Sequence, residues 1–358
     1  MRSQSWLLVS SVALVLAFGC SDSEEGEGIN GVGGMAAPTG GSSGAGGTPP
    51  QSGGSGGALT GGAGGAAGMV GTGGTSGAGG MGTGGMVVAG SGSGGDTSGD
   101  AGTMEPADAG DDPGFPRLPK VTTTDGPGSF TAVTKEKSTP PGGWLIYPTN
   151  AGEGGMRHPI FLFGPGGGTT PERYETSGMH WDRYASYGFV IYVLAMSSGD
   201  GAAMKEGLDW VIGLNEDASH PLYQKLDTTK VAASGHSLGS VTTFDFMPDD
   251  RVTTTIHISG GSFDAMGPLN LRNDTMFMCA ENEVATPQCD GDFEVSTVPT
   301  FYTLVQGANH LTSARTGWPA TIAWLLWHLA GHDEWRAEFL EEDGQFRTGI
   351  YKSQVKNW

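Results

Sequence analysis

One pentapeptide, Gly235-His236-Ser237-Leu238-Gly239, places a serine between two glycines with a single residue on each side. The run VAAS that leads into it is typical of a strand, and the run SVTTFDFM that follows Gly239 favours a helix. A serine at such a sharp strand-to-helix turn adopts a strained backbone, and the flanking glycines relieve the crowding. We therefore predict Ser237 as an exposed nucleophile, with a chance Gly-Ser loop as the alternative.

A serine hydroxyl is a poor nucleophile at neutral pH and needs a neighbouring base. His310 follows the apolar run 301–305 directly, where a loop at a strand end can hold its ring over Ser237. His236 is too close to Ser237 in sequence to act as its base, and we expect it to line the substrate cleft. The other histidines in the second half of the domain are expected to pack, cap a helix or be buried: His257, His328 and His332.

The third member of such a triad is a carboxylate that orients the imidazole, and we expect it after the apolar run 275–280. Four residues compete for this role: Glu281, Glu283, Asp290 and Asp292. We predict Glu283, with loop bracing or a solvated turn as the alternative roles of its neighbours. Asp264 is the next candidate if none of the four serves.

Two backbone donors must face the negative charge that develops on the attacked carbonyl oxygen. One is expected from the N–H of Leu238, directly after the serine. The other is expected from the turn of residues 166–168 (GGG), which follows the apolar run 159–164 and leaves room for an approaching carbonyl. A tight glycine turn without this role is the alternative interpretation.

Apolar runs alternate with helical periodicity between these residues, as expected for strands joined by crossover helices. Strands are predicted at 143–148, 159–164, 189–196, 230–234, 254–259, 275–280 and 300–305. Helices are predicted at 181–187, 202–214 and 319–330. The sequence thus predicts an α/β domain with a mostly parallel sheet and helices on both faces.

Composition divides the 358 residues into three parts. Residues 21–112 contain 35 of the 65 glycines and lack aromatic and basic residues, so we predict a disordered acidic linker. Residues 113–358 form the predicted catalytic domain and carry 28 acidic and 17 basic side chains. This excess of acidic groups argues against nucleic acid and anionic membrane surfaces as partners.

The first 20 residues have the layout of an export signal, with Arg2 ahead of the apolar run 7–18. The run is followed directly by Gly19-Cys20, and this junction resembles a bacterial lipobox. That resemblance implies lipid attachment at Cys20 and anchoring to a bacterial membrane, either the outer membrane or the cell surface. An ordinary cleaved signal, and a secreted protein, is the alternative.

Cysteine counting supports the anchor, because the three cysteines leave an even pair once Cys20 is acylated. In an oxidising compartment Cys279 and Cys289 can form a disulfide that clamps the loop carrying Glu283. Two unpaired thiols are the alternative.

With these residues placed, residues 159–339 resemble the α/β-hydrolase superfamily, and within it the bacterial cutinase-like, polyester-hydrolase and dienelactone-hydrolase group. The resemblance is carried by PLYQKLDTTKVAASGHSLG, CAENEVATP, LVQGANHLTS and AWLLWHLAGHDEWRAEF. It implies Ser237 as nucleophile, His310 as base, and Leu238 and Gly167 as oxyanion donors. The group usually has Asp where this chain has Glu283.

The expected activity is that of a serine esterase, lipase-like or cutinase-like, acting on a small or lipid-like ester through an acyl-enzyme. No metal or organic cofactor is expected, the only expected membrane contact is through the lipid anchor, and the chain is expected to be a monomer. A surface-displayed binding lipoprotein on the same fold is the main alternative, and an acyltransferase or peptidase is a third.

Overall fold

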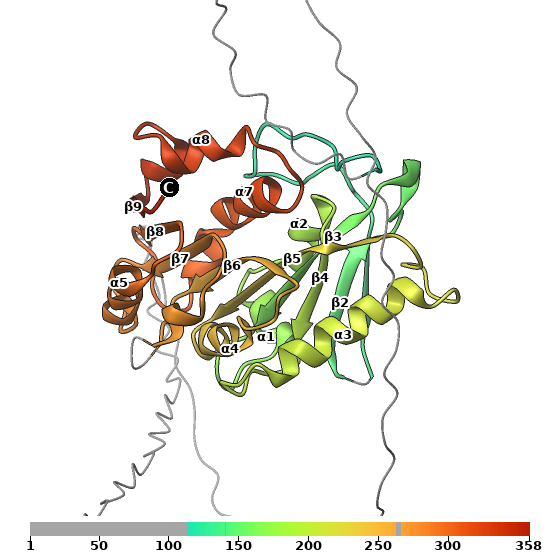
Figure 1. Cartoon of the computed structure of the whole chain (residues 1–358), viewed down its shortest axis with the longest axis horizontal. Coiled ribbons are helices and arrows are strands. Elements are labelled where there is room, and N and C mark those ends of the chain that lie inside the picture. The colour runs from blue at the N-terminus through green and yellow to red at the C-terminus, as the bar shows by residue number, and fades with distance from the viewer. Residues whose placement is uncertain (1–113, 140, 263–265) are drawn as a thin grey trace, which may run out of the picture. The chain divides into compact units, whose positions relative to one another are not determined.

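The computed structural model describes residues 114–139, 141–262 and 266–358. These residues build a nine-stranded sheet in the order β1-β2-β4-β3-β5-β6-β7-β8-β9 (Figure 1). The six strands from β4 to β8 in this order are parallel, whereas β1, β2 and β9 run antiparallel to their neighbours. The predicted α/β class with a mostly parallel sheet is confirmed.

The strands are β1 (Val133–Lys137), β2 (Gly143–Pro148), β3 (His158–Gly164), β4 (Val190–Leu194), β5 (Leu226–His236), β6 (Val252–Ile258), β7 (Thr275–Ala280), β8 (Thr300–Val305) and β9 (Tyr351–Lys356). The α-helices are α1 (Pro171–Thr176), α2 (Trp181–Ser186), α3 (Ala202–Glu216), α4 (Leu238–Phe246), α5 (Thr286–Val295), α6 (Ser313–Thr316), α7 (Trp318–His328) and α8 (Trp335–Leu340). Short 3-10 turns cover Glu153–Gly155, Gly267–Asn270 and Gln345–Arg347. Within the described ranges, no helix has both the length and the apolar character that crossing a bilayer requires.

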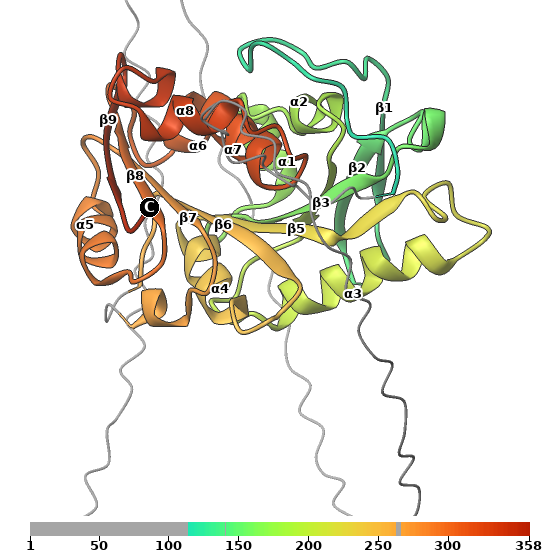
Figure 2. The same cartoon turned by 45° about the horizontal axis from the view of Figure 1, so that its top comes forward.

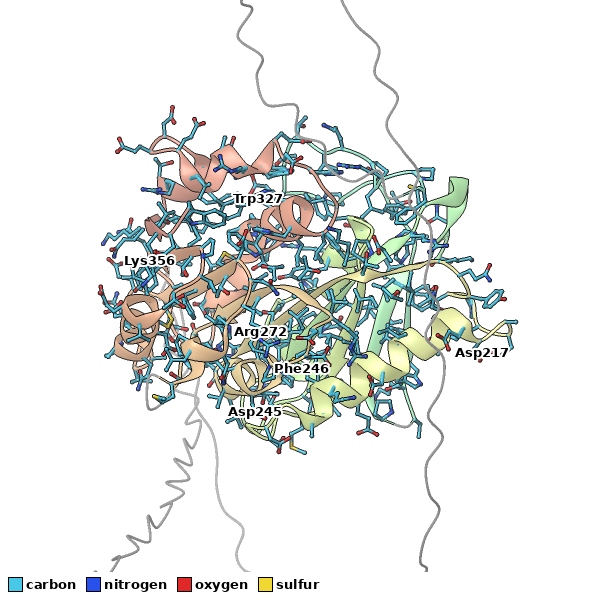
Figure 3. All side chains as sticks on the ribbon, viewed as in Figure 1. Asp217, Asp245, Phe246, Arg272, Trp327 and Lys356 are labelled. Carbon is cyan, nitrogen blue, oxygen red and sulfur yellow. A yellow bond between two sulfur atoms is a disulfide. The ribbon has the colours of Figure 1, made fainter. Side chains whose placement is uncertain are left out.

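Side chains of the central strands alternate between two buried layers, because successive residues of a strand point to opposite faces of the sheet. Phe161 and Phe163 of β3 pack in one layer with residues of α2, α7 and α8. Ile160 and Leu162 pack in the other layer with residues of α3, α4 and α5. Figure 2 shows these two groups of helices on opposite sides of the sheet, and Figure 3 shows the side chains that fill the space between.

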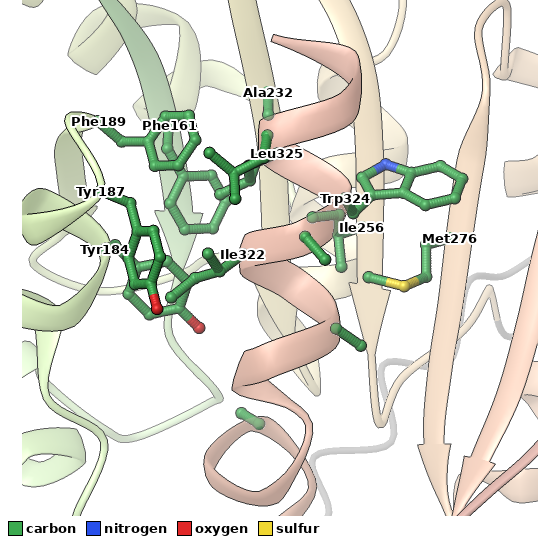
Figure 4. Packing of buried hydrophobic residues seen from close by; sticks show 14 of the residues in the cluster. Phe161, Tyr184, Tyr187, Phe189, Ala232, Ile256, Met276, Ile322, Trp324 and Leu325 are labelled. Carbon is green, nitrogen blue, oxygen red and sulfur yellow. The ribbon is translucent and has the colours of Figure 1, made fainter. Parts of the chain in front are cut away.

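Helix α7 is apolar on nearly all sides, as its sequence predicts, because it packs both against the sheet and against helix α8. Ile322 and Leu325 face Phe161 and the rings near α2, while Trp324 lies beside Ile256 and Met276 (Figure 4). The Trp324 indole N–H donates to Thr254 Oγ1 at 2.8 Å, so the buried ring also has its polar atom satisfied.

Each predicted strand and helix is present, with ends that shift by a few residues. Strands β1 and β9 and helices α1, α5, α6 and α8 were not predicted. The predicted export signal, Cys20 and the predicted linker 21–112 lie outside the described residues. Asp264 also lies outside them.

Candidate active site

Ser237 is the single residue between the end of β5 and the start of α4. Its backbone has φ 55° and ψ −119°, a conformation that residues with a side chain rarely adopt. The turn is close-packed: a Cβ on Gly239 would lie 2.0 Å from the Gly164 carbonyl oxygen, and one on Gly235 would lie 2.0 Å from the Gly239 oxygen. The glycines of the motif are therefore required by packing, and the strained turn directs the serine out of the strand.

The structure brings together the three side chains that sequence reasoning selected. His310 Nε2 lies 3.0 Å from Ser237 Oγ, and His310 Nδ1 lies 2.6 Å from Glu283 Oε2. Ser237 follows β5, Glu283 follows β7 and His310 follows β8, so all three lie at the carboxyl ends of parallel strands. This is the hydrogen-bond order of nucleophile, base and orienting acid.

The Glu283 side chain is fully buried, although it comes from a loop. Its Oε1 accepts hydrogen bonds from the Ser259 hydroxyl at 2.7 Å and from the Ala280 N–H. Burial alone would raise the pKa of this carboxyl, but the hydrogen bonds from His310, Ser259 and Ala280 outweigh burial and lower it. Glu283 is therefore ionised at neutral pH, as an acid that stabilises an imidazolium must be.

The competing carboxylates have other partners. Glu281 pairs with Lys352 of β9, and Asp290 accepts from the Tyr302 hydroxyl. Asp292 is buried and accepts from the N–H and the hydroxyl of Ser262, at 2.7 Å and 2.6 Å. Among these four carboxylates, Glu283 accepts the hydrogen bond from His310 Nδ1–H.

The turn after β3 lies against the serine, as predicted. A Cβ on Gly166 would lie 3.4 Å from Ser237 Cβ, and one on Gly167 would lie 3.3 Å from Leu238 Cδ2. The Gly166 N–H donates to Tyr174 Oη at 2.7 Å. Within the described part of the chain, the N–H groups of Gly167 and Leu238 donate to no protein acceptor, so they remain available to an oxyanion.

His236 is buried, with 4% of its surface exposed. Its Nδ1 lies 2.6 Å from the Tyr174 hydroxyl, and its Nε2 lies 2.6 Å from the main-chain oxygen of His310. We predicted that His236 lines the substrate cleft; the structure shows instead that both ring nitrogens are bonded to protein groups.

Cys279 of β7 and Cys289 of α5 form a disulfide. The bridge closes the loop that carries Glu283 and joins the strand before the acid to the helix after it. The expected pairing of these two cysteines is confirmed.

Two residues that shape the site were not predicted to do so. Tyr174 of α1 lies in the polar run PERYET, which carries no sign of a partner at His236. Ser259 follows β6 with φ 45° and a buried side chain, and it holds Glu283 across 24 residues of sequence. The strained conformation of Ser259 is visible only in the structure.

Within the same described ranges, no group of three or more His, Cys, Asp or Glu side chains is arranged to hold a metal ion. A comparison of the chain with protein-family models finds no match, and a comparison with curated proteins finds none either.

Proposed function

We propose that this protein is a serine hydrolase that cleaves carboxylic esters through an acyl-enzyme intermediate. The observation that carries the proposal is the pair of distances at His310, 3.0 Å to Ser237 Oγ and 2.6 Å to Glu283 Oε2. A binding protein on this fold has no physical need for a strained serine, a base and a buried acid in hydrogen-bond order.

In the proposed reaction, Ser237 Oγ attacks the ester carbonyl carbon while its proton passes to His310 Nε2. Glu283 accepts a hydrogen bond from His310 Nδ1–H and stabilises the imidazolium that forms. The carbonyl oxygen becomes an oxyanion facing the N–H groups of Leu238 and Gly167. His310 then protonates the leaving alkoxide. In the second half of the reaction His310 deprotonates a water molecule that attacks the acyl carbon, the bond to Ser237 Oγ breaks, and His310 returns the proton to Ser237 as the acid is released.

We propose membership of the α/β-hydrolase superfamily on the same grounds. The chain order Ser237, Glu283, His310 follows the order in which that fold carries its triad. The three residues directly follow the parallel strands β5, β7 and β8, at the carboxyl ends of these strands.

An uncharged, partly apolar ester is the proposed substrate class. Val284 and Leu311, the residues after Glu283 and His310, expose 71% and 68% of their surface, so apolar side chains adjoin the triad. The net negative charge of residues 113–358 disfavours polyanionic substrates. The proposed location is outside the cytoplasm, on a lipid anchor at Cys20 or, if Cys20 is not acylated, secreted.

The test compares fluorophosphonate labelling and ester hydrolysis in the unaltered protein and in the Ser237→Ala variant. We expect the unaltered protein to hydrolyse a chromogenic short-chain ester and to be labelled by a fluorophosphonate at Ser237, and Ser237→Ala to lose both. Ser234→Ala is the matched control, because Ser234 lies on β5 and its buried hydroxyl has no partner among the described residues. Hydrolysis that survives Ser237→Ala, or labelling at another serine, would refute the proposal.

A further inference from the structure

The hydrogen bonds around His236 determine where its proton lies. The main-chain oxygen of His310 is only an acceptor, so the Nε2 atom 2.6 Å away must carry the hydrogen. In the neutral ring Nδ1 is then the acceptor, and the Tyr174 hydroxyl donates to it across 2.6 Å. The Tyr174 oxygen in turn accepts from the Gly166 N–H. Each group therefore donates to the next, from the Gly166 N–H through Tyr174 and His236 to the His310 oxygen.

The ring is neutral for two physical reasons. Burial disfavours its charged form, and the neighbouring His310 adds to this effect, so the pKa of His236 is lowered to about 4. His236 and His310 have ring centroids 4.9 Å apart, yet His236 does not compete for the proton that leaves Ser237.

The chain of hydrogen bonds joins three segments that the reaction needs in register. Gly166 belongs to the turn that supplies the oxyanion donor, His236 is bonded covalently to Ser237, and His310 lies on the loop between β8 and α6. The His310 main-chain oxygen has one other hydrogen bond, from the Ser313 hydroxyl at the longer distance of 3.4 Å. The bond from His236 is therefore the shorter of the two that this oxygen accepts within the described residues.

We propose that His236 and Tyr174 are positioning residues, which fix the base loop and the oxyanion turn relative to Ser237. The inference rests on the proposed function, because it concerns the geometry of the same triad. It differs from a substrate-binding role for His236, in which a ring nitrogen would have to leave Tyr174 or His310 to reach the substrate.

The test compares Tyr174→Phe with Tyr184→Phe. The first variant removes the hydroxyl between Gly166 and His236 and keeps the ring. The second removes a buried hydroxyl from the same aromatic cluster, and that hydroxyl has no hydrogen bond to His236 or Gly166. We expect Tyr174→Phe to lower kcat by about ten-fold or more, because a misplacement of about 1 Å in a reacting pair can cost a hundred-fold. KM should change by less than about three-fold, and Tyr184→Phe should change neither.

Two further measurements separate positioning from general destabilisation. The rate of fluorophosphonate labelling at Ser237 should fall in parallel with kcat, because it reports activation of the serine. His236→Gln, which can still donate to the His310 oxygen and accept from Tyr174, should retain more of the labelling rate than His236→Leu. This pair of variants decides the question if Tyr174→Phe fails to fold.

Equal labelling rates and kcat in Tyr174→Phe and Tyr184→Phe, or equal rates in His236→Gln and His236→Leu, would overturn the positioning role. A rise in KM with unchanged kcat in these variants would also overturn the positioning role, because it would indicate that His236 binds the substrate. A protein that is not labelled at Ser237, or remains active as Ser237→Ala, would instead refute the proposed function. The two failures are therefore distinguishable.

Discussion

Acidification from pH 8 to pH 5 should destabilise the folded protein strongly, because burial lowers the pKa of five histidines: His158, His236, His257, His328 and His332. Burial is the main cause that lowers the pKa of His257 and His328 to about 3 and that of His236 to about 4. His257 stacks on Phe244 with ring centroids 3.8 Å apart, and His328 packs against Trp324 at 4.2 Å. Protonation of either ring would bury a positive charge, which is the main reason that both pKa values are lowered.

The magnitude follows from the difference between the folded and unfolded pKa values. An unfolded histidine has a pKa of about 6.5, so below pH 6.5 the unfolded state binds more protons than the folded state. The stability that neutral burial provides is complete above pH 6.5 and is lost as the pH falls toward the folded pKa. At pH 5, 1.5 pH units below the unfolded value, each histidine costs about 2 kcal/mol at about 1.4 kcal/mol per unit. His236, His257 and His328 together cost about 6 kcal/mol, which is comparable to the total stability of a typical domain.

The assay is urea unfolding followed by tryptophan fluorescence at pH 8, 7, 6 and 5. Free carboxyl groups are ionised in both states over most of this range, so the histidines dominate the change. His257→Gln should reduce the loss of unfolding free energy between pH 8 and pH 5 by about 2 kcal/mol. His180→Gln, at an exposed position, should leave it unchanged. Equal free energies of unfolding at pH 8 and pH 5, or an unaltered pH dependence in His257→Gln, would refute the reasoning.

Three further outcomes follow from the site and the anchor. Glu283→Gln should lower kcat by several orders of magnitude, as the loss of about ten-thousand-fold for an acid-to-amide change in a triad indicates. Glu281→Gln should cost far less, and the reverse order in an ester assay would place the acid at Glu281. Reducing the Cys279–Cys289 bridge should lower the melting temperature and the activity, because it frees the loop that carries the acid; calorimetry with and without a reductant checks this. Cys20→Ala should move the protein from the membrane fraction to the soluble exported fraction on an immunoblot, and unchanged fractionation would require another anchor.

Elements buried on both faces were predictable because their sequences are nearly continuous apolar runs. Strand β7 (TMFMCA) was predicted with its observed ends. The strand predicted at 189–196 is longer at both ends than the observed β4 (Val190–Leu194). Strand β9 (YKSQVK) was not predicted, because it pairs on one side only and mixes charged and polar residues. The first four residues of β5 (LDTT) were missed because they also include polar and charged residues, although Leu226 and Asp227 pair with β3.

The residues of the triad were predictable because each follows an apolar run, so local sequence identifies the end of the sheet at which it lies. The residues that support them were not. Tyr174 reaches His236 across 62 residues and Ser313 reaches Ser259 across 54, and neither sequence neighbourhood indicates a partner. Such contacts depend on how helices α1 and α6 pack at the rim of the sheet.

The triad draws on strands that lie far apart along the chain, since His310 and Ser237 are separated by 73 residues and His310 and Glu283 by 27. Contacts of this kind form slowly during folding, because long loops must close before parallel strands can pair. A refolding chain should therefore regain helix signal before it regains the hydrogen bond between His310 and Ser237. Until β8 has paired with β7, His310 is not held beside Ser237, so a partly folded chain would lack the proposed hydrolase activity.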